Sequence, residues 1–204
     1  MKIYTYLALG DSYTIGEKVS LFQSFPYQAV QLLRQKGYNF TAPEIVATTG
    51  WTTGELQSAI EATKLLPTYT MVTLLIGVNN QYRGRPVEEF RMHFRYLLEQ
   101  ALRFADNIAR HVTVLSIPDW SVTPYAANED RNRISSEIDL YNFICQAEAA
   151  HFQTNYIDIT TSQRADGHSS DYLASDRLHP AGKEYLKWAE KLSAEMENAF
   201  ETTG

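Results

Sequence analysis

The chain has 204 residues, 44% of them hydrophobic and 21% charged, with a formal net charge of −6 at pH 7. This composition is typical of a globular protein with a full core and excludes a disordered chain. No cluster of Lys and Arg is dense enough to follow a phosphate backbone, and no apolar run approaches the roughly 18 residues of a membrane helix, so we expect neither a nucleic-acid partner nor a transmembrane segment.

The amino terminus leads almost directly into the first predicted strand. From Met1 onward the sequence shows no export leader, so we expect a cytoplasmic protein, although a leader removed earlier would leave the same sequence. The single cysteine, Cys145, excludes an intramolecular disulfide and a metal site built from several cysteines.

Five short runs of β-branched and apolar residues predict strands. Two of them, Met71–Ile76 and Val112–Ile117, are nearly continuous in apolar residues, as expected for parallel strands covered on both faces. The other three are Tyr4–Leu9, Glu44–Ala47 and Asn155–Ile159.

Helical patterns separate these runs, which predicts an α/β fold with a parallel sheet. Ser24 is a candidate cap for a helix over Phe25–Lys36. Thr52 and Glu55 have the spacing of a capping box, which predicts a helix through about Leu65.

Three more helices follow along the chain. Pro86 suits the first turn of a long helix, and Pro180 precedes the last one. Between them, apolar residues recur at steps of three or four, so we expect Cys145 to be a core residue and not a nucleophile. This stripe consists of Ile134, Ile138, Tyr141, Cys145 and Ala149.

Two connections are too long to be plain turns. They are Pro118–Asn128, after the fourth predicted strand, and Thr160–Leu178, after the fifth. Long loops at the carboxyl ends of parallel strands usually carry or cover a site. No internal repeat or linker composition divides the chain, so we expect residues 1–204 to form one domain.

A hydroxyl stands immediately after the first strand, in Gly10-Asp11-Ser12. A side chain at this point is held rigidly at the rim of the sheet, where α/β folds carry out chemistry. Ser12 is therefore a candidate nucleophile, while its alternative role is to cap the next turn.

An Asp-x-x-His pair ends the second long loop. At this spacing Asp176 can bond one imidazole nitrogen of His179 and leave the other free to act as a base. The alternative is that both residues only cap the following helix. An extended chain covers about 3.3 Å per residue, so the loop is long enough to bring the pair over Ser12.

Two more strand ends carry candidate donors to a developing negative charge. Gly50 precedes a helix and allows its backbone N–H to approach a ligand closely. The Asn79 amide supplies an uncharged donor suited to an oxyanion hole. Each also has a purely structural alternative: Gly50 is then only a turn glycine, and Asn79 only forms an Asx turn.

Together, a serine, a glycine, an asparagine and an Asp-x-x-His pair follow the first, second, third and fifth predicted strands. As a set they resemble the SGNH hydrolase superfamily, also called the GDSL esterases and lipases. The resemblance implies a flavodoxin-like three-layer α/β/α sandwich with a five-stranded parallel sheet in the order 2-1-3-4-5, and hydrolysis of carboxylic esters. Its motifs, which span almost the whole chain, are Gly10-Asp11-Ser12, Gly50, Gly77-Val78-Asn79 and Asp176-Arg177-Leu178-His179-Pro180.

The resemblance also implies a role for each residue. Ser12 resembles the nucleophile of an acyl-serine mechanism, and its own N–H, the Gly50 N–H and the Asn79 side chain resemble the oxyanion hole. His179 resembles the base, and Asp176 the residue that orients it.

Two further positions belong to these motifs. Asp11 is part of the signature, and we interpret it as structural, bonding the turn after the strand. Asn80 stands where the family often has Asp. Because the oxyanion position is Asn79, this departure bears on what holds Asn79, or on the substrate side of the cleft.

Aromatic and arginine side chains lie near every proposed loop and are candidate contacts to the substrate. The alternatives are rim packing for the rings and plain solvation for the arginines. The expected contacts are Tyr13, Trp51, Tyr82, Arg83, Trp120 and Tyr125, with Arg85 and Tyr172 nearby.

The sequence leaves the ester itself open among acetylated sugars, lysophospholipids, thioesters and short-chain esters. It contains no phosphate-binding glycine motif and no histidine pair typical of zinc, so we expect no cofactor and no metal. The alternative function is a non-catalytic module that binds a glycan or a lipid on the same fold. The oligomeric state stays open.

Overall fold

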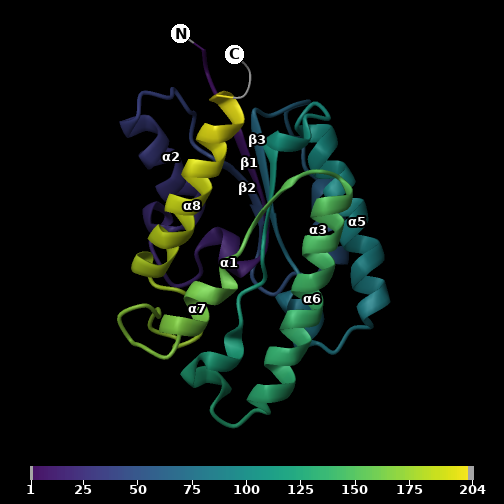
Figure 1. The fold of residues 1–204 in the computed structure, drawn as a ribbon, viewed down its shortest axis with the longest axis vertical. Helices are drawn as coiled ribbons and strands as arrows, with labels where there is room; N and C mark the ends of the chain where they lie inside the picture. Colours follow the sequence, from purple (N-terminus) through teal and green to yellow (C-terminus); the bar gives the residue numbers. More distant parts are fainter. Residues whose placement is uncertain (1, 202–204) are drawn as a thin grey trace.

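Five parallel strands form the centre of the structure, a computed structural model that describes residues 2–201 (Figure 1). They lie in the order β2-β1-β3-β4-β5, which confirms the expected α/β sandwich and its strand order. The strands are β1 (Tyr6–Gly10), β2 (Glu44–Ala47), β3 (Met71–Leu75), β4 (Val112–Leu115) and β5 (Asn155–Ile157).

The three inner strands are buried along their whole length, as their continuous apolar sequences predict. Three predicted strands were too long, because β3 ends at Leu75, β4 at Leu115 and β5 at Ile157. The first strand begins at Tyr6, while Tyr4 forms only an isolated bridge to Phe40.

Helices cover both faces of the sheet (Figure 1). On one face, α2 (Phe25–Gln35) packs against α8 (Gly182–Glu201). On the other lie α3 (Thr53–Ala62), α5 (Val87–Phe104) and α6 (Arg131–His151). Cys145, on the buried side of α6, is fully enclosed in the core, as its place in an apolar stripe predicts. The terminal residues 1 and 202–204 of the expected domain lie outside the described part of the chain.

Helix ends agree only partly with the sequence. Glu55 accepts hydrogen bonds from the N–H and the hydroxyl of Thr52, so the predicted box forms, although α3 ends at Ala62 and not near Leu65. Ser24 stands at the cap position of α2, but its hydroxyl donates back to Leu21 O and caps nothing. Pro86 is the residue before α5 and not part of its first turn.

Several short elements follow the strands where the sequence predicted only loops. The segment expected to be irregular from Thr160 begins instead with α7 (Thr160–Asp166), because the Thr160 hydroxyl donates to Ile117 O and the Arg164 guanidinium pairs with Asp119. These tertiary contacts replace the apolar stripe that such a polar segment lacks. The remaining short helices are α1 (Ser12–Ile15) and α4 (Val78–Tyr82), with 3₁₀ turns at Leu21–Gln23, Ala109–His111, Trp120–Val122 and Pro124–Ala126.

Gly77 makes the turn between β3 and α4. Its φ of 135° is one that side chains rarely adopt, and a Cβ there would lie 2.6 Å from both Ile117 Cδ1 and Phe90 Cε2. The turn therefore requires glycine, and it sets the direction in which α4 presents its first residues. Within residues 2–201, no helix is both long and apolar enough to cross a bilayer.

We expect Gly77→Ala to lower the free energy of unfolding by about 2–4 kcal/mol, since it adds backbone strain to overpacking. The matched control is Gly84→Ala. Gly84 also has positive φ (+60°), but nothing lies within 4 Å of its added Cβ, so the expected cost is about 1 kcal/mol. Urea unfolding measures both, and equal costs for the two variants would contradict this account of the Gly77 turn.

Candidate active site

Ser12 lies at the carboxyl end of the inner strand β1, as the first residue of α1. Asp11 begins this helix, because its side chain accepts the Tyr13 N–H at 3.0 Å. The carboxylate thus bonds the turn after the strand, as interpreted from the sequence. The turn holds the Ser12 side chain at the edge of the sheet, where it lines a cavity.

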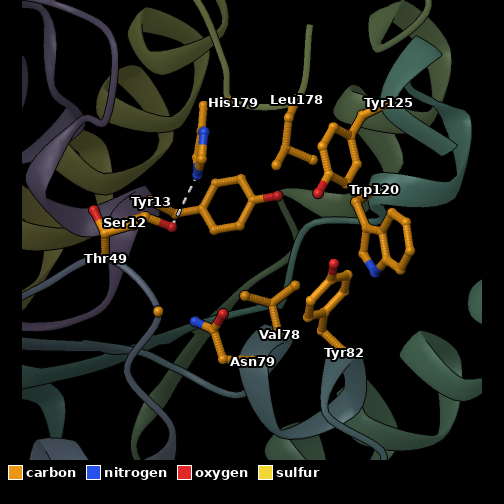
Figure 2. Close-up of a pocket in the computed structure, with 11 residues that line it drawn as sticks. Ser12, Tyr13, Thr49, Val78, Asn79, Tyr82, Trp120, Tyr125, Leu178 and His179 are labelled. Carbon is orange, nitrogen blue, oxygen red and sulfur yellow. Dashed lines mark hydrogen bonds between the residues drawn. The ribbon is translucent and has the colours of Figure 1, made fainter. Parts of the chain in front are cut away.

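Three side chains from opposite ends of the chain form one hydrogen-bonded row. His179 Nε2 lies 2.9 Å from Ser12 Oγ, the contact drawn in Figure 2. Its Nδ1 lies 2.6 Å from Asp176 Oδ2. The structure therefore brings together the three residues that the sequence singled out, with His179 in the middle.

The Asp176 carboxylate fixes the orientation of the ring. Its Oδ1 accepts the N–H groups of Leu178 and His179, both at 3.1 Å, which leaves Oδ2 for the imidazole. Burial alone would raise the pKa of Asp176, but the bonds from the His179 ring and these N–H groups outweigh it and lower the pKa below its usual value. A carboxylate only accepts, so Nδ1 carries the proton and Nε2 is left to accept from Ser12.

Gly50 and Asn79 approach Ser12 from the two strands beside β1. Gly50 and Asn79 line the same cavity as Ser12, and Asn79 points into it (Figure 2). Gly50 has φ 86°, and its N–H and that of Ser12 have no backbone acceptor within residues 2–201. Asn79 Nδ2 donates to Trp51 O at 3.0 Å and, over a longer distance of 3.5 Å, to Asp11 Oδ2.

Asn80 holds the start of α3 against α4. Its Oδ1 accepts the Thr53 N–H at 3.0 Å and its Nδ2 donates to the Thr53 hydroxyl at 2.8 Å. The side chain is fully buried and faces away from the cavity that Asn79 lines. The amide in place of the common carboxylate therefore affects how the Gly50 loop is held, and it does not contact the cavity.

The cavity beside Ser12 has a volume of about 160 Å³ and an aromatic wall. Four of the expected contacts line it, namely Tyr13, Tyr82, Trp120 and Tyr125 (Figure 2). Trp51 and Arg83 do not, because they line a neighbouring pocket together with Arg85. Tyr172 lies away from both and stacks under Lys187. Three further lining residues were not predicted as contacts: Thr49, which precedes Gly50, and Val78 and Leu178, which lie inside the motifs.

A polar chain behind the aromatic wall fixes Trp120. The Trp120 Nε1–H donates to Gln81 Oε1 at 2.8 Å, and Gln81 Nε2 donates to Glu137 at 2.7 Å. The preceding Asp119 is fully buried and pairs with Arg164 at 2.8 Å. The segment after β4 is thus tied to α4, α6 and α7, and Trp120 is a fixed part of the cavity wall.

Chemically, the row of hydroxyl, imidazole and carboxylate can remove a proton from Ser12 as its oxygen attacks an electrophile. The N–H donors around the same point can bind the negative charge that such an attack creates. In the described part of the chain, no group of three or more His, Cys, Asp or Glu side chains is placed to hold a metal ion.

Comparisons with known proteins place these features in context. A model of the GDSL-like lipase/acylhydrolase family matches residues 8–185. Among solved structures, TesA has a TM-score of 0.75 at 17% identity, with 96% of this chain and 99% of that chain covered. The lipase/acylhydrolase from Enterococcus faecalis has a TM-score of 0.73 at 17% identity and covers 97% and 96%. Axe2, an acetylxylan esterase from Geobacillus stearothermophilus, has a TM-score of 0.74 at 15% identity and covers 95% and 94%.

At these identities the likeness to solved structures shows the fold alone. No curated protein sequence matches the chain significantly.

The buried carboxyl of Asp11 makes the free energy of unfolding depend on pH. Burial raises the pKa of its carboxyl from 3.8 to about 7, against the opposing effect of the Tyr13 N–H. The folded state then holds this proton more tightly than the unfolded state, so the contribution of Asp11 to stability is complete below pH 4 and is lost as the pH rises through about 7. This difference corresponds to about 4 kcal/mol.

We therefore expect Asp11→Asn to gain stability relative to the wild type as the pH rises from 4 to 8. Urea unfolding across this range measures the gain. Asp106→Asn, at an exposed aspartate, is the control and should follow the wild type throughout. Parallel pH profiles for Asp11→Asn and the wild type would contradict the raised pKa.

Proposed function

The chain belongs to the GDSL-like lipase/acylhydrolase family and so is a hydrolase that acts on esters, and on that premise we propose that it is a serine esterase. It cleaves carboxylic esters through an acyl-serine intermediate, and residues 1–204 act as one catalytic domain. The observation that carries this proposal is the 2.9 Å contact between Ser12 Oγ and His179 Nε2, with Asp176 on the other ring nitrogen.

In the first half of the reaction, Ser12 Oγ attacks the ester carbonyl while its proton passes to His179 Nε2. The ring becomes positively charged next to the Asp176 carboxylate, which stabilises it. The proton then passes to the alkoxy oxygen, the alcohol leaves, and the acyl group stays on Ser12. In the second half, His179 takes a proton from water, the resulting oxygen attacks the acyl-serine, and the acid departs as Ser12 recovers its proton.

Each tetrahedral intermediate carries a negative oxygen. The proposed donors to it are the N–H groups of Ser12 and Gly50 and the Asn79 amide, whose long 3.5 Å contact to Asp11 Oδ2 gives way to the oxyanion. All three donors lie at the carboxyl end of the sheet, next to the Ser12 side chain. Two are backbone groups and one is a side-chain amide, and none carries a charge. They therefore stabilise the intermediate without binding a carboxylate product too tightly. Loss of one such donor typically costs about a hundred- to a thousand-fold in rate.

The size and lining of the cavity support esters with short acyl groups. Its volume of about 160 Å³ is close to that of protein cavities that hold a benzene molecule. Trp120, Tyr82 and Tyr125 pack edge to face along one side, with ring centroids 5.5 and 6.1 Å from that of Trp120. A chain of about six carbons fills this space, and a longer one has to extend past the rim.

The first test of this proposal is the reactivity of Ser12. We expect a fluorophosphonate probe to label the wild type, and we expect Ser12→Ala to lose both labelling and at least a thousand-fold of its turnover of 4-nitrophenyl butyrate. Ser136→Ala changes an exposed serine on α6 and serves as the matched control with full labelling. Labelling or turnover that persists in Ser12→Ala would overturn the mechanism, and an unlabelled wild type would favour a binding module.

The second test concerns acyl length. We expect kcat/KM for 4-nitrophenyl esters to peak at four to six acyl carbons, on the order of the cavity size, and to fall for laurate. Trp120→Ala removes a buried ring from the wall, so its optimum should move to longer chains. The readout is a series of initial rates, and an optimum that stays in place in Trp120→Ala would show that this cavity does not hold the acyl group.

A further inference from the structure

Arg83, the residue directly after α4, reaches back across the loop that follows β2. Its Nη2 donates to the carbonyl oxygen of Gly50 at 2.5 Å. Its Nη1 meanwhile pairs with the Glu55 carboxylate at 3.2 and 3.3 Å. One guanidinium therefore joins the end of α4, the Gly50 loop and the first turn of α3.

The Glu55 carboxylate is itself fixed by the loop. Its Oε2 accepts the Thr52 N–H at 2.8 Å and the Thr52 hydroxyl at 2.9 Å, besides the contact from Arg83. The residues from Gly50 to Thr52 are thus held at one end by Arg83 and at the other by Glu55, and these two side chains are bonded to each other.

The Gly50 peptide depends on contacts from other residues, because glycine has no side chain that could hold it in place. The φ of Gly50 is 86°, and a glycine crosses between backbone conformations more easily than any other residue. On either side of it the loop is bonded, since the Thr49 hydroxyl donates to Glu17 and Trp51 O accepts from Asn79. Within residues 2–201, Arg83 is the donor that the structure assigns to the Gly50 carbonyl itself.

We propose that Arg83 is a positioning residue that holds the Gly50 peptide so that its N–H faces the oxygen of the tetrahedral intermediate. This inference rests on the proposed function and deepens it. It also replaces the expectation that Arg83 contacts the substrate. Arg83 lines the pocket on the other side of the Gly50 loop, with Trp51 and Arg85, and not the cavity beside Ser12.

The ion pair contributes little to overall stability, which makes the proposal testable. The side chains of Arg83 and Glu55 are 40% and 45% exposed, and solvent-exposed pairs of this kind typically contribute little to the free energy of unfolding. Removal of the guanidinium should therefore leave the fold intact and free the Gly50 peptide to rotate. A displacement of about 1 Å at a reacting site can cost about a hundred-fold in rate.

The experiment compares Arg83→Ala with Arg85→Ala. Arg85 is the matched control, because its guanidinium lines the same pocket but makes no ion pair or hydrogen bond within residues 2–201. For 4-nitrophenyl butyrate, we expect Arg83→Ala to lose about 10- to 100-fold in kcat with KM within about two-fold of the wild type. We expect Arg85→Ala to keep both constants. Methylguanidinium added to the buffer should restore part of the kcat of Arg83→Ala alone, because it fits the open pocket that the arginine vacates.

The outcomes separate this inference from the proposed function. A wild type that neither hydrolyses esters nor reacts with a fluorophosphonate overturns the proposed function. A reactive wild type with an unchanged kcat in Arg83→Ala overturns only the role of Arg83. A rise in KM alone would make Arg83 a substrate contact, and a lowered thermal midpoint without rescue by methylguanidinium would make its role structural; both contradict the proposal.

Discussion

The site depends on one hydrogen bond that joins the two ends of the chain, between Ser12 Oγ and His179 Nε2. Ser12 follows the inner strand β1, whereas His179 comes after the chain has already passed to β5 at the far edge of the sheet. The segment from α7 to α8 has to cross back over the strand ends to bring the ring into place. The packing of α8 against α2, on the face that also carries α1, fixes where this crossing ends (Figure 1). The proposed nucleophile and base are therefore held in register by the whole sandwich.

The order of the strands explains why the other proposed groups meet at the same point. Gly10, at the end of β1, pairs with Ala47 of β2 on one side and with Leu75 of β3 on the other. Gly50 and Asn79 lie only a few residues beyond these two partners, so they arrive on either side of Ser12. The carboxyl ends of parallel strands all lie at the same end of the sheet. Because β1 has a neighbour on each side, its carboxyl end lies between the carboxyl ends of those two strands. The turns that bring Gly50 and Asn79 to this point use the positive φ of Gly50 and Gly77, and the Asp176–His179 turn uses that of Arg177, at 61°.

The sequence predicts the parts of this architecture that follow from periodicity and from strand ends. Buried strands give continuous apolar runs, and the residues directly after them, such as Ser12 and Asn79, are visible as candidates without any structure. What stayed hidden were the short helices α1, α4 and α7, because segments of four to seven residues contain too few turns to show a stripe. The place of Arg83 was hidden as well. In the sequence, a long charged side chain after a motif fits either a solvated residue or a substrate contact. The bond from Arg83 to the Gly50 carbonyl becomes visible only when the two are placed in space.

Beyond the strand ends, apolar packing no longer fixes positions, and polar contacts take over this task. The aromatic wall is held through Gln81 on Trp120 and through Arg164 on Asp119, and the opposite side through Asn80 on Thr53 and Arg83 on Gly50. Donors stabilise a transient oxyanion most when they are already oriented before the charge appears, because no reorganisation then opposes the reaction. Loop glycines cannot provide that order themselves, so it has to come from side chains that make no contact with the reacting atoms. In this chain Asn80 and Gln81 lie on α4, Arg83 directly follows it and Arg164 lies on α7, so the short helix after β3 supports both walls of the cavity.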